Sequence, residues 1–136
     1  MTNVIIDSNL FFSGLRTTNN WVRDTLDRPD LAFFTPNFLI VEIFKYKEEI
    51  VRKSKASESE VYDLLDLMLQ KITFVNIEAI DLGNLIHAHR LCADIDEKDT
   101  LFVALTLNLA GRYWTRDRRI KEGLERKGFD QFFDAE

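Results

Sequence analysis

A chain of 136 residues in which 46% of the side chains are hydrophobic can bury a core of its own, which excludes an unfolded chain and a small disulfide-built scaffold. Its 18 basic and 23 acidic residues leave a net charge of −5, which argues against a protein that coats nucleic acids through bulk positive charge. The single cysteine, Cys92, cannot form an internal disulfide, and no apolar run reaches the roughly 18 residues that a membrane span needs. The first residues also lack the pattern of a secretion signal, so we expect one domain over residues 1–136 in a cytoplasmic protein.

The first half of the chain is predicted to alternate between strands and helices. Residues 4–6 and 31–34 are short apolar runs that fit buried strands. The pair Thr35-Pro36 is typical of an N-cap and a first helical residue, which predicts a helix from residue 36 to about 54. Ser57, with Glu60 three residues later, forms a capping box that predicts a second helix to about residue 70.

The alternation continues through the middle of the chain. Residues 72–77 alternate between apolar and polar side chains and predict a third strand, and a helix is expected over residues 81–91. Asp96 is predicted to cap a helix over residues 98–109, which Gly111 should close.

The C-terminal part completes the pattern. Residues 112–114 predict a fourth strand, and a last helix over residues 117–127 should end at Gly128. A weaker strand pattern lies at residues 129–133. Because apolar strands that alternate with helices need cover on both faces, the sequence predicts a three-layer α/β/α sandwich with a central, mostly parallel sheet.

Polar side chains gather where this fold should have its ligand site. In open α/β sheets that site lies beyond the carboxyl ends of the strands. The polar residues expected near this edge are Asp7, Ser8, Asn9, Glu42, Asp96, Asp99, Thr115, Arg116 and Asp117. Most of the ionisable groups among them are carboxylates, so the sequence predicts an acidic centre at this edge.

Several of these acids also have an ordinary structural explanation. Asp96, Asp99 and Asp117 stand at predicted helix starts, where a carboxylate caps free N–H groups and interacts well with the helix dipole. Asp7 can serve as a turn residue after its strand. Taken singly, capping is the favoured explanation for the three acids at the helix starts.

Glu42 is harder to explain in this way, because it lies inside an apolar helical stretch with aromatic and leucine side chains on its own face. An isolated buried carboxylate costs several kcal/mol, so Glu42 needs a partner. An arginine could satisfy Glu42 alone. A cation shared with Asp7, Asp99 and Asp117 would satisfy all four acids and remove their mutual repulsion.

The type of ligand indicates which cation this would be. Carboxylate oxygens without histidine or cysteine favour Mg²⁺ or Mn²⁺ over zinc. Such ions activate water and stabilise the leaving oxygen in the hydrolysis of phosphodiesters. The acidic centre therefore indicates metal-dependent phosphoryl chemistry.

Four parts of the sequence together resemble a known family. They are the run VIIDSN at residues 4–9, Glu42 within its helix, the run DEKDTLFVAL at residues 96–105 and the run WTRD at residues 114–117. In this order and at this length, the chain resembles the PIN-domain family over essentially its whole extent. The resemblance implies a PIN-like fold with a Mg²⁺- or Mn²⁺-dependent ribonuclease site. Many small members are VapC-type toxins, which cleave RNA, are held inactive by a cognate antitoxin and often form homodimers.

The resemblance also implies a role for individual residues. The catalytic, metal-binding acids are expected to be Asp7, Glu42, Asp99 and Asp117. Asp96 is expected to be an additional metal-binding or supporting acid, and the choice between Asp96 and Asp99 as the main third ligand stays open. Hydrogen bonds near the metal are expected from Ser8, Asn9 and Thr115.

The local distribution of charge is consistent with an RNA substrate. Residues 112–127 contain seven basic and three acidic residues, and residues 45–55 contain five basic and two acidic residues. A basic rim beside an acidic centre suits a phosphodiester backbone, although a solvated helix face explains the same pattern equally well. The residues expected to bind RNA are Arg116, Arg118, Arg119 and Lys121.

Two other functions make different demands on the sequence. A non-catalytic RNA- or protein-binding module of the same fold is the alternative to an enzyme, and it predicts a missing or mispaired acid, which the sequence does not show. A phospho-acceptor signalling domain predicts adjacent acids after the first strand, whereas Ser8 and Asn9 follow Asp7.

Overall fold

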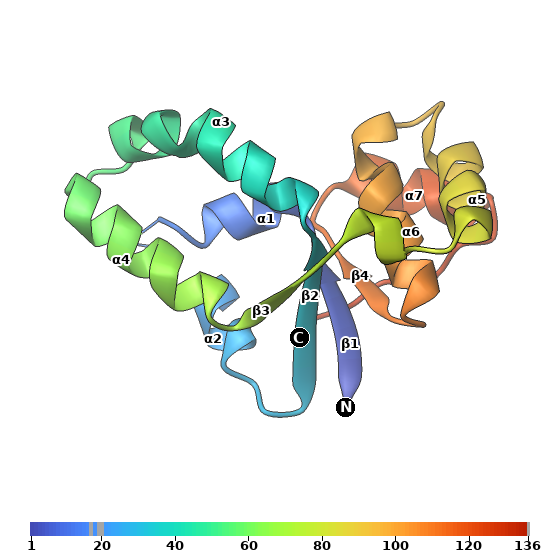
Figure 1. Cartoon of the computed structure of the whole chain (residues 1–136), viewed down its shortest axis with the longest axis horizontal. Helices are drawn as coiled ribbons and strands as arrows, with labels where there is room; N and C mark the ends of the chain where they lie inside the picture. The colour runs from blue at the N-terminus through green and yellow to red at the C-terminus, as the bar shows by residue number, and fades with distance from the viewer. Residues whose placement is uncertain (17, 19–20, 136) are drawn as a thin grey trace.

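The central sheet consists of parallel strands in the order β3-β2-β1-β4 (Figure 1). The structure is a computed structural model that describes residues 1–16, 18 and 21–135. The strands are β1 (Thr2–Ile6), β2 (Leu31–Pro36), β3 (Ile72–Val75) and β4 (Arg112–Trp114). Because β1 lies between β2 and β4, the loops that follow β1 and β4 leave the sheet side by side.

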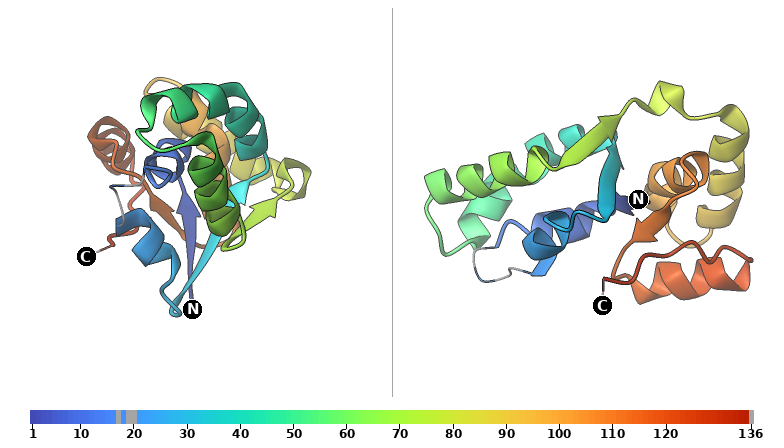
Figure 2. Two further views of the ribbon diagram at one scale, coloured as in Figure 1. Left: turned by 90° about the vertical axis from the view of Figure 1, so that its left-hand side faces the viewer. Right: turned by 90° about the horizontal axis from the view of Figure 1, so that it is seen from below.

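Helices cover both faces of this sheet, as the two views of Figure 2 show. One face carries α1 (Ser8–Ser13), α2 (Trp21–Leu26), α3 (Phe38–Lys53) and α4 (Glu58–Leu69). The other face carries α5 (Leu82–Cys92), α6 (Thr100–Asn108) and α7 (Arg118–Arg126). Two short 3-10 helices, η1 (Ile77–Ala79) and η2 (Glu97–Asp99), precede α5 and α6. The predicted three-layer α/β/α sandwich is confirmed.

The alternation of side chains along the strands divides the interior into two cores. Val4, Ile6 and Trp114 point toward α1–α4, whereas Ile5 and Tyr113 point toward α5–α7. Directly after these strands, Asp7 follows β1 and Thr115 follows β4, and the two side chains meet through a hydrogen bond.

Helix α6 is apolar on all sides, and its central residues are buried. It packs between α5 and the sheet, in contact with β1, β2 and β4. A helix that is apolar all round belongs in the interior, and this position brings its N-terminus, with Asp99, to the carboxyl edge of the sheet.

Several element boundaries differ from the prediction. Thr35 and Pro36 are the last residues of β2 and do not begin a helix; α3 begins only after Asn37. Pro36 is tolerated because β1 pairs with β2 only as far as Phe34, so the end of β2 is an edge on that side. Strand β3 ends at Val75, because the side chain of Asn76 accepts a hydrogen bond from the Glu78 N–H and starts η1.

Two further differences lie toward the ends of the chain. The weak pattern at residues 129–133 does not form a named strand, and only an isolated bridge joins Phe132 to Tyr113. No helix was predicted between the strands at residues 4–6 and 31–34, where the structure has the short helices α1 and α2. None of the helices in the described parts of the chain has the length and apolar character needed to cross a membrane.

The end of α6 also differs from the prediction, which assigned the closing position to Gly111. The left-handed residue is Ala110, with φ 48°, and the N–H groups of Ala110 and Gly111 donate to the carbonyls of Leu107 and Thr106. Gly111 has a different role. A Cβ there would lie 2.7 Å from Ile5 Cδ1 and 2.8 Å from the carbonyl oxygen of Asn3, so only glycine allows this close approach to β1.

Candidate active site

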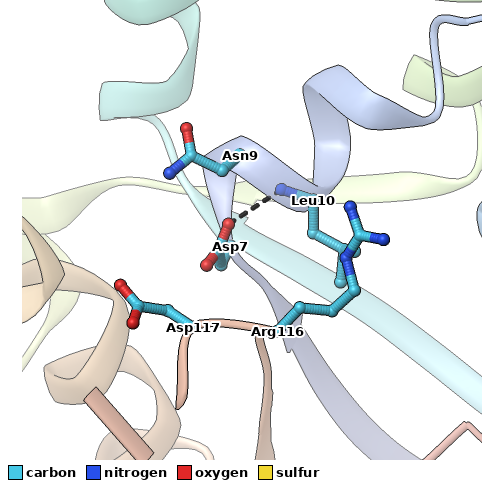
Figure 3. A pocket seen from close by; sticks show the side chains of 5 residues that line it. All are labelled: Asp7, Asn9, Leu10, Arg116 and Asp117. Atoms are coloured by element: carbon cyan, nitrogen blue, oxygen red, sulfur yellow. Dashed lines mark hydrogen bonds between the residues drawn. The ribbon is translucent and has the colours of Figure 1, made fainter. Parts of the chain in front are cut away.

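A pocket of about 260 Å³ lies at the carboxyl ends of β1 and β4. Figure 3 shows the side chains around it, which belong to Asp7, Asn9, Leu10, Arg116 and Asp117. The side chains of Asp7 and Asp117 lie next to each other, and the side chain of Arg116 leads away from Asp117 toward Leu10 (Figure 3). The edge of the sheet that the sequence singled out therefore contains a pocket with two of the predicted acids.

Asp7 is the best-fixed acid of the site. It follows β1 directly and caps α1, so its Oδ1 accepts a hydrogen bond of 2.9 Å from the Leu10 N–H. Its Oδ2 accepts a hydrogen bond of 2.5 Å from the Thr115 hydroxyl, which arrives from the end of β4. Burial raises the pKa of Asp7 above its ordinary value, against the lowering effect of these hydrogen bonds, because only 7% of the residue is exposed.

Asp117 approaches the same pocket from the start of α7. Its Oδ1 accepts from the N–H groups of Arg119 and Ile120, so it caps α7 as a helix-start aspartate commonly does. Its own N–H donates to the Thr115 hydroxyl, which also holds Asp7. The negative charge of Asp117 adds to the effect of burial and raises the pKa of Asp7.

Asp99 reaches the site from η2 and α6 on the other side. It occupies the N-cap position of α6 without capping it, and it accepts a hydrogen bond from the Tyr113 hydroxyl. Burial raises the pKa of Asp99 to about 7, and the charges of Asp7, Asp96 and Asp117 act in the same direction. Asp96 lies further back, where its side chain caps η2 through the Lys98 N–H.

Glu42 completes the acidic group from α3, one turn into the helix. Burial raises the pKa of Glu42, and so does the charge of Asp7, whereas a hydrogen bond with Ser8 and the charges of Lys98 and Lys45 lower it. Its Oε1 is buried and has no hydrogen-bond partner among the described residues. Asp7 thus connects the acids electrostatically. Its charge raises the pKa of Glu42 and of Asp99, and the charge of Asp117 raises the pKa of Asp7.

The supporting residues differ in how close they lie to the acids. Thr115 holds Asp7, and Ser8 bonds with Glu42, whereas Asn9 is exposed and lines the pocket. Tyr113 was not singled out from the sequence, where it is one aromatic residue in a short apolar strand. The sequence pattern could have indicated the location of Tyr113, because alternation along β4 places residue 113 on the same face of the sheet as Thr115, the face that α6 covers.

The four basic residues expected to bind RNA have different surroundings. Arg116 lines the pocket and its guanidinium lies 5.1 Å from the ring centre of Trp21. Arg118 is exposed at the start of α7. Arg119 donates a hydrogen bond of 2.6 Å to the Ile95 carbonyl, and Lys121 lies 5.8 Å from the ring centre of Phe132. Arg116 is therefore the one of the four that lines the pocket.

A comparison with protein families agrees with this geometry. A family model described as a PIN domain matches residues 5–132. The chain belongs to the PIN domain family. PIN domains are generally nucleases and usually use divalent metal ions, so the chain has a nuclease-type function in general terms. No curated protein matched the chain in a separate search.

The acids of this PIN domain suit a divalent cation by their chemistry. They offer carboxylate oxygens alone, which Mg²⁺ and Mn²⁺ prefer, and one of these oxygens, Glu42 Oε1, is buried without a partner in the described structure. As the described side chains stand, no three acidic, histidine or cysteine groups are arranged to hold one ion together. Asp99 bonds to Tyr113 and Asp117 caps its own helix, so these two carboxylates are engaged elsewhere.

Proposed function

We propose that this PIN domain is a Mg²⁺- or Mn²⁺-dependent endoribonuclease. Asp7, Glu42, Asp99 and Asp117 are the metal-binding, catalytic acids in this proposal, and Asp96 supports Asp99 from the same turn. Ser8, Asn9 and Thr115 hold the acids or line the pocket, while Arg116, Arg118, Arg119 and Lys121 supply positive charge for the RNA backbone.

One observation carries the proposal: Asp7 is buried, and Glu42 and Asp99 are half-buried, without an ion pair among the described residues that offsets their charge, whereas Asp117 is exposed. Burial raises the pKa of Asp7, Glu42 and Asp99, and none of the three forms an ion pair with a described lysine or arginine. Buried carboxylates of this kind destabilise a fold unless something offsets their charge. They are therefore expected at a functional site, and a divalent cation is the partner that suits them best.

The orphaned polar atoms support the same conclusion. Three buried side-chain oxygens have no hydrogen-bond partner among the described residues: Thr35 Oγ1, Glu42 Oε1 and Thr100 Oγ1. Of these, Glu42 Oε1 belongs to a proposed metal-binding acid, near the start of α3 at the carboxyl edge of the sheet. Buried polar atoms without partners are uncommon, and this one suits a site that takes up water or an ion.

The residues of the chain have defined tasks in this reaction. Thr115 and the Leu10 N–H fix the two oxygens of Asp7, and Tyr113 fixes one oxygen of Asp99. A bound divalent ion supplies positive charge for the phosphodiester in its transition state and lowers the pKa of water. Arg116, at the pocket wall, can reach a phosphate that lies against the acids.

Cleavage of RNA by the purified protein tests the proposal. Unpaired RNA is incubated with Mn²⁺ or Mg²⁺, with EDTA, and with the Asp7→Asn variant. Asparagine keeps an acceptor for the Leu10 N–H, its NH2 group can donate to the Thr115 hydroxyl oxygen, and it is a good N-cap, so the fold should remain intact. We expect cleavage to fall at least 100-fold in this variant and to stop in EDTA, roughly the loss that follows removal of one strong electrostatic contribution to catalysis.

A variant with the same chemical change elsewhere is the control. Asp130→Asn replaces an exposed aspartate outside the pocket lining and should cleave RNA like the unaltered chain. Full activity of Asp7→Asn would contradict the site. Absence of both cleavage and Mn²⁺ binding in the unaltered chain would favour the non-catalytic binding module.

The partners expected from the resemblance are proposals of the same kind. We propose that the protein is the toxin of a toxin–antitoxin pair and that it forms a homodimer. An antitoxin that places an arginine among the four acids would inhibit the enzyme, because that charge competes with the metal.

A further inference from the structure

Trp21 and Arg116 form a pair beside the acidic pocket that the proposed catalytic roles leave largely unused. Trp21 begins α2 and is 37% exposed, although one edge of its ring packs on the core. Its ring meets the buried Trp114 ring edge to face, with 5.9 Å between ring centres. Trp114 in turn packs against Phe33 and Phe133, so Trp21 is a rigidly supported aromatic surface.

The backbone after β4 explains how this pair lies next to the acids. Strand β4 ends at Trp114, the backbone is extended again at Asp117, and successive side chains from residue 114 to residue 117 point to different sides. Thr115 and Asp117 point toward Asp7, whereas Trp114 and Arg116 point toward Trp21. Figure 3 shows Arg116 and Asp117 leaving the chain in different directions. Four consecutive residues thus build the acidic site and the aromatic surface side by side.

Arg116 connects the two parts. Its guanidinium lies over the Trp21 ring at 5.1 Å, and the same side chain lines the pocket with Asp7 and Asp117. It forms no ion pair with a described carboxylate, so its charge remains available to a phosphate. A planar cation on an indole ring also offers a second stacking surface.

We propose that Trp21 and Arg116 form a stacking platform for an unpaired nucleobase, which makes the enzyme select single-stranded RNA. The inference rests on the proposed ribonuclease function. A base can stack on Trp21 or on the guanidinium while its phosphate lies toward the acids, because Arg116 borders both. In a duplex the bases face each other and are not available to such a platform. The platform therefore discriminates between unpaired and paired strands without reading sequence.

Binding in EDTA, where no cleavage occurs, tests the platform separately from catalysis. Labelled RNA of about 12 nucleotides is compared as an unstructured single strand and as a duplex, by fluorescence anisotropy. The informative variants are Trp21→Leu and Trp21→Phe, because both keep an apolar side chain over Trp114 and only phenylalanine keeps an aromatic face. We expect Trp21→Leu to weaken single-strand binding by about 5-fold to 100-fold, Trp21→Phe to restore most of it, and duplex binding to stay unchanged.

Arginine variants and tryptophan fluorescence add independent evidence. Arg116→Ala should weaken single-strand binding more than duplex binding, whereas Arg118→Ala, which removes the same charge, should weaken both equally. The chain has two tryptophans and Trp114 is buried, so single-stranded RNA should quench mainly Trp21, and Trp21→Phe should abolish the quenching.

Several results would overturn the platform. Equal affinity for single strand and duplex, equal affinity of Trp21→Leu and Trp21→Phe, or no binding of either RNA at about 100 µM protein would each do so. If the protein cleaves RNA but Trp21 has no effect, only the platform fails. If it binds single strands through Trp21 but does not cleave them, only the nuclease proposal fails.

Discussion

At the scale of single residues, Asp7, Glu42 and Asp99 share one physical property. Each is a carboxylate whose pKa is raised by burial, and each is held by a hydroxyl group and not by a cation. Thr115 holds Asp7, Ser8 holds Glu42 and Tyr113 holds Asp99. Hydroxyl donors fix the direction of a carboxylate and leave most of its charge unneutralised, which is what a metal site needs.

Tyr113 is the residue through which this arrangement can be altered without removing an acid. Its hydroxyl lowers the pKa of Asp99, so Tyr113→Phe should raise that pKa further and leave a larger fraction of Asp99 protonated at pH 7. Because only the carboxylate form binds a metal, we expect Mn²⁺ affinity at pH 7 to fall by several-fold and to recover near pH 8.5. Calorimetric titration at the two pH values measures this. A loss that is the same at both values would show that Tyr113 acts on packing alone.

The raised pKa of Asp99 also predicts how stability depends on pH. The pKa is about 7 in the folded protein against an ordinary value of 3.8, so the folded state binds more protons between these values. The free energy of unfolding should therefore fall as the pH rises from about 4 to about 7, with no further change from this group above it. Asp99→Asn removes the effect and keeps an acceptor for Tyr113.

A comparison of the unaltered chain with Asp99→Asn in EDTA separates the contribution of Asp99 to the pH dependence of stability from the contributions of the other acids. The variant should equal the unaltered chain near pH 4 and be more stable by about 1–3 kcal/mol at pH 8, as followed by thermal unfolding. A stability difference that is constant across this range would rule out titration of Asp99 as its cause.

At the scale of elements, several local capping signals were predictable. The capping box of Ser57 and Glu60, the Asp117 cap and the end of α7 at Gly128 lie where the sequence placed them, whereas Asp96 caps η2 and not α6. Each of these signals is a local interaction between a side chain and the nearest backbone, so no knowledge of the fold is needed.

Features that depend on the rest of the fold were missed. Helix α1 has six residues, which is too few for a helix that is stable alone. It forms because Leu10 and Phe11 pack into the core and because Asp7 caps its N-terminus. The hydrogen bond from Tyr113 to Asp99 joins residues 14 positions apart through the packing of α6 on β4. Sequence patterns gave the four acids and their order, but not which groups hold them.

The close contact between Gly111 and β1 gives a prediction about the element that carries Asp7. In Gly111→Ala the new methyl group would press on Ile5 and on the backbone of Asn3, neither of which can move freely. We expect a loss of about 1–3 kcal/mol in the free energy of unfolding. Gly83→Ala in α5 is the matched control, because a Cβ there meets nothing within 4 Å, and it should be neutral or stabilising by up to about 1 kcal/mol. Chemical denaturation measures both, and equal effects would contradict the contact.

At the scale of the whole molecule, the exposed apolar side chains are unevenly distributed. Ile40, Val41 and Phe44 are exposed together on α3, and Phe44 is 68% exposed. An apolar patch of this kind commonly marks an association surface. If the proposed homodimer uses this patch, Phe44→Glu should convert a concentration-dependent dimer to a monomer with an unchanged circular dichroism spectrum.

Light scattering after gel filtration distinguishes the outcomes. Leu82→Glu on α5 is the control, since Leu82 is 69% exposed and lies on the opposite face of the sheet. A dimer that persists in Phe44→Glu and dissociates in Leu82→Glu would move the interface to the α5 face. A monomer at every concentration of the unaltered chain would remove the homodimer from the proposal.

The uncompensated acids finally connect metal binding to the stability of the whole fold. An ion that binds the folded state alone raises its stability by an amount set by the ratio of ion concentration to Kd, about 2.7 kcal/mol at 100 times Kd. For a chain of this size we expect Mn²⁺ to raise the Tm by roughly 5–10 °C at pH 8. The rise should be smaller at pH 5, because the raised pKa values of Asp7, Glu42 and Asp99 let protons compete with the metal. Asp7→Asn should lose most of the rise and Asp130→Asn should keep it, whereas an equal rise in both would place the ion outside the pocket.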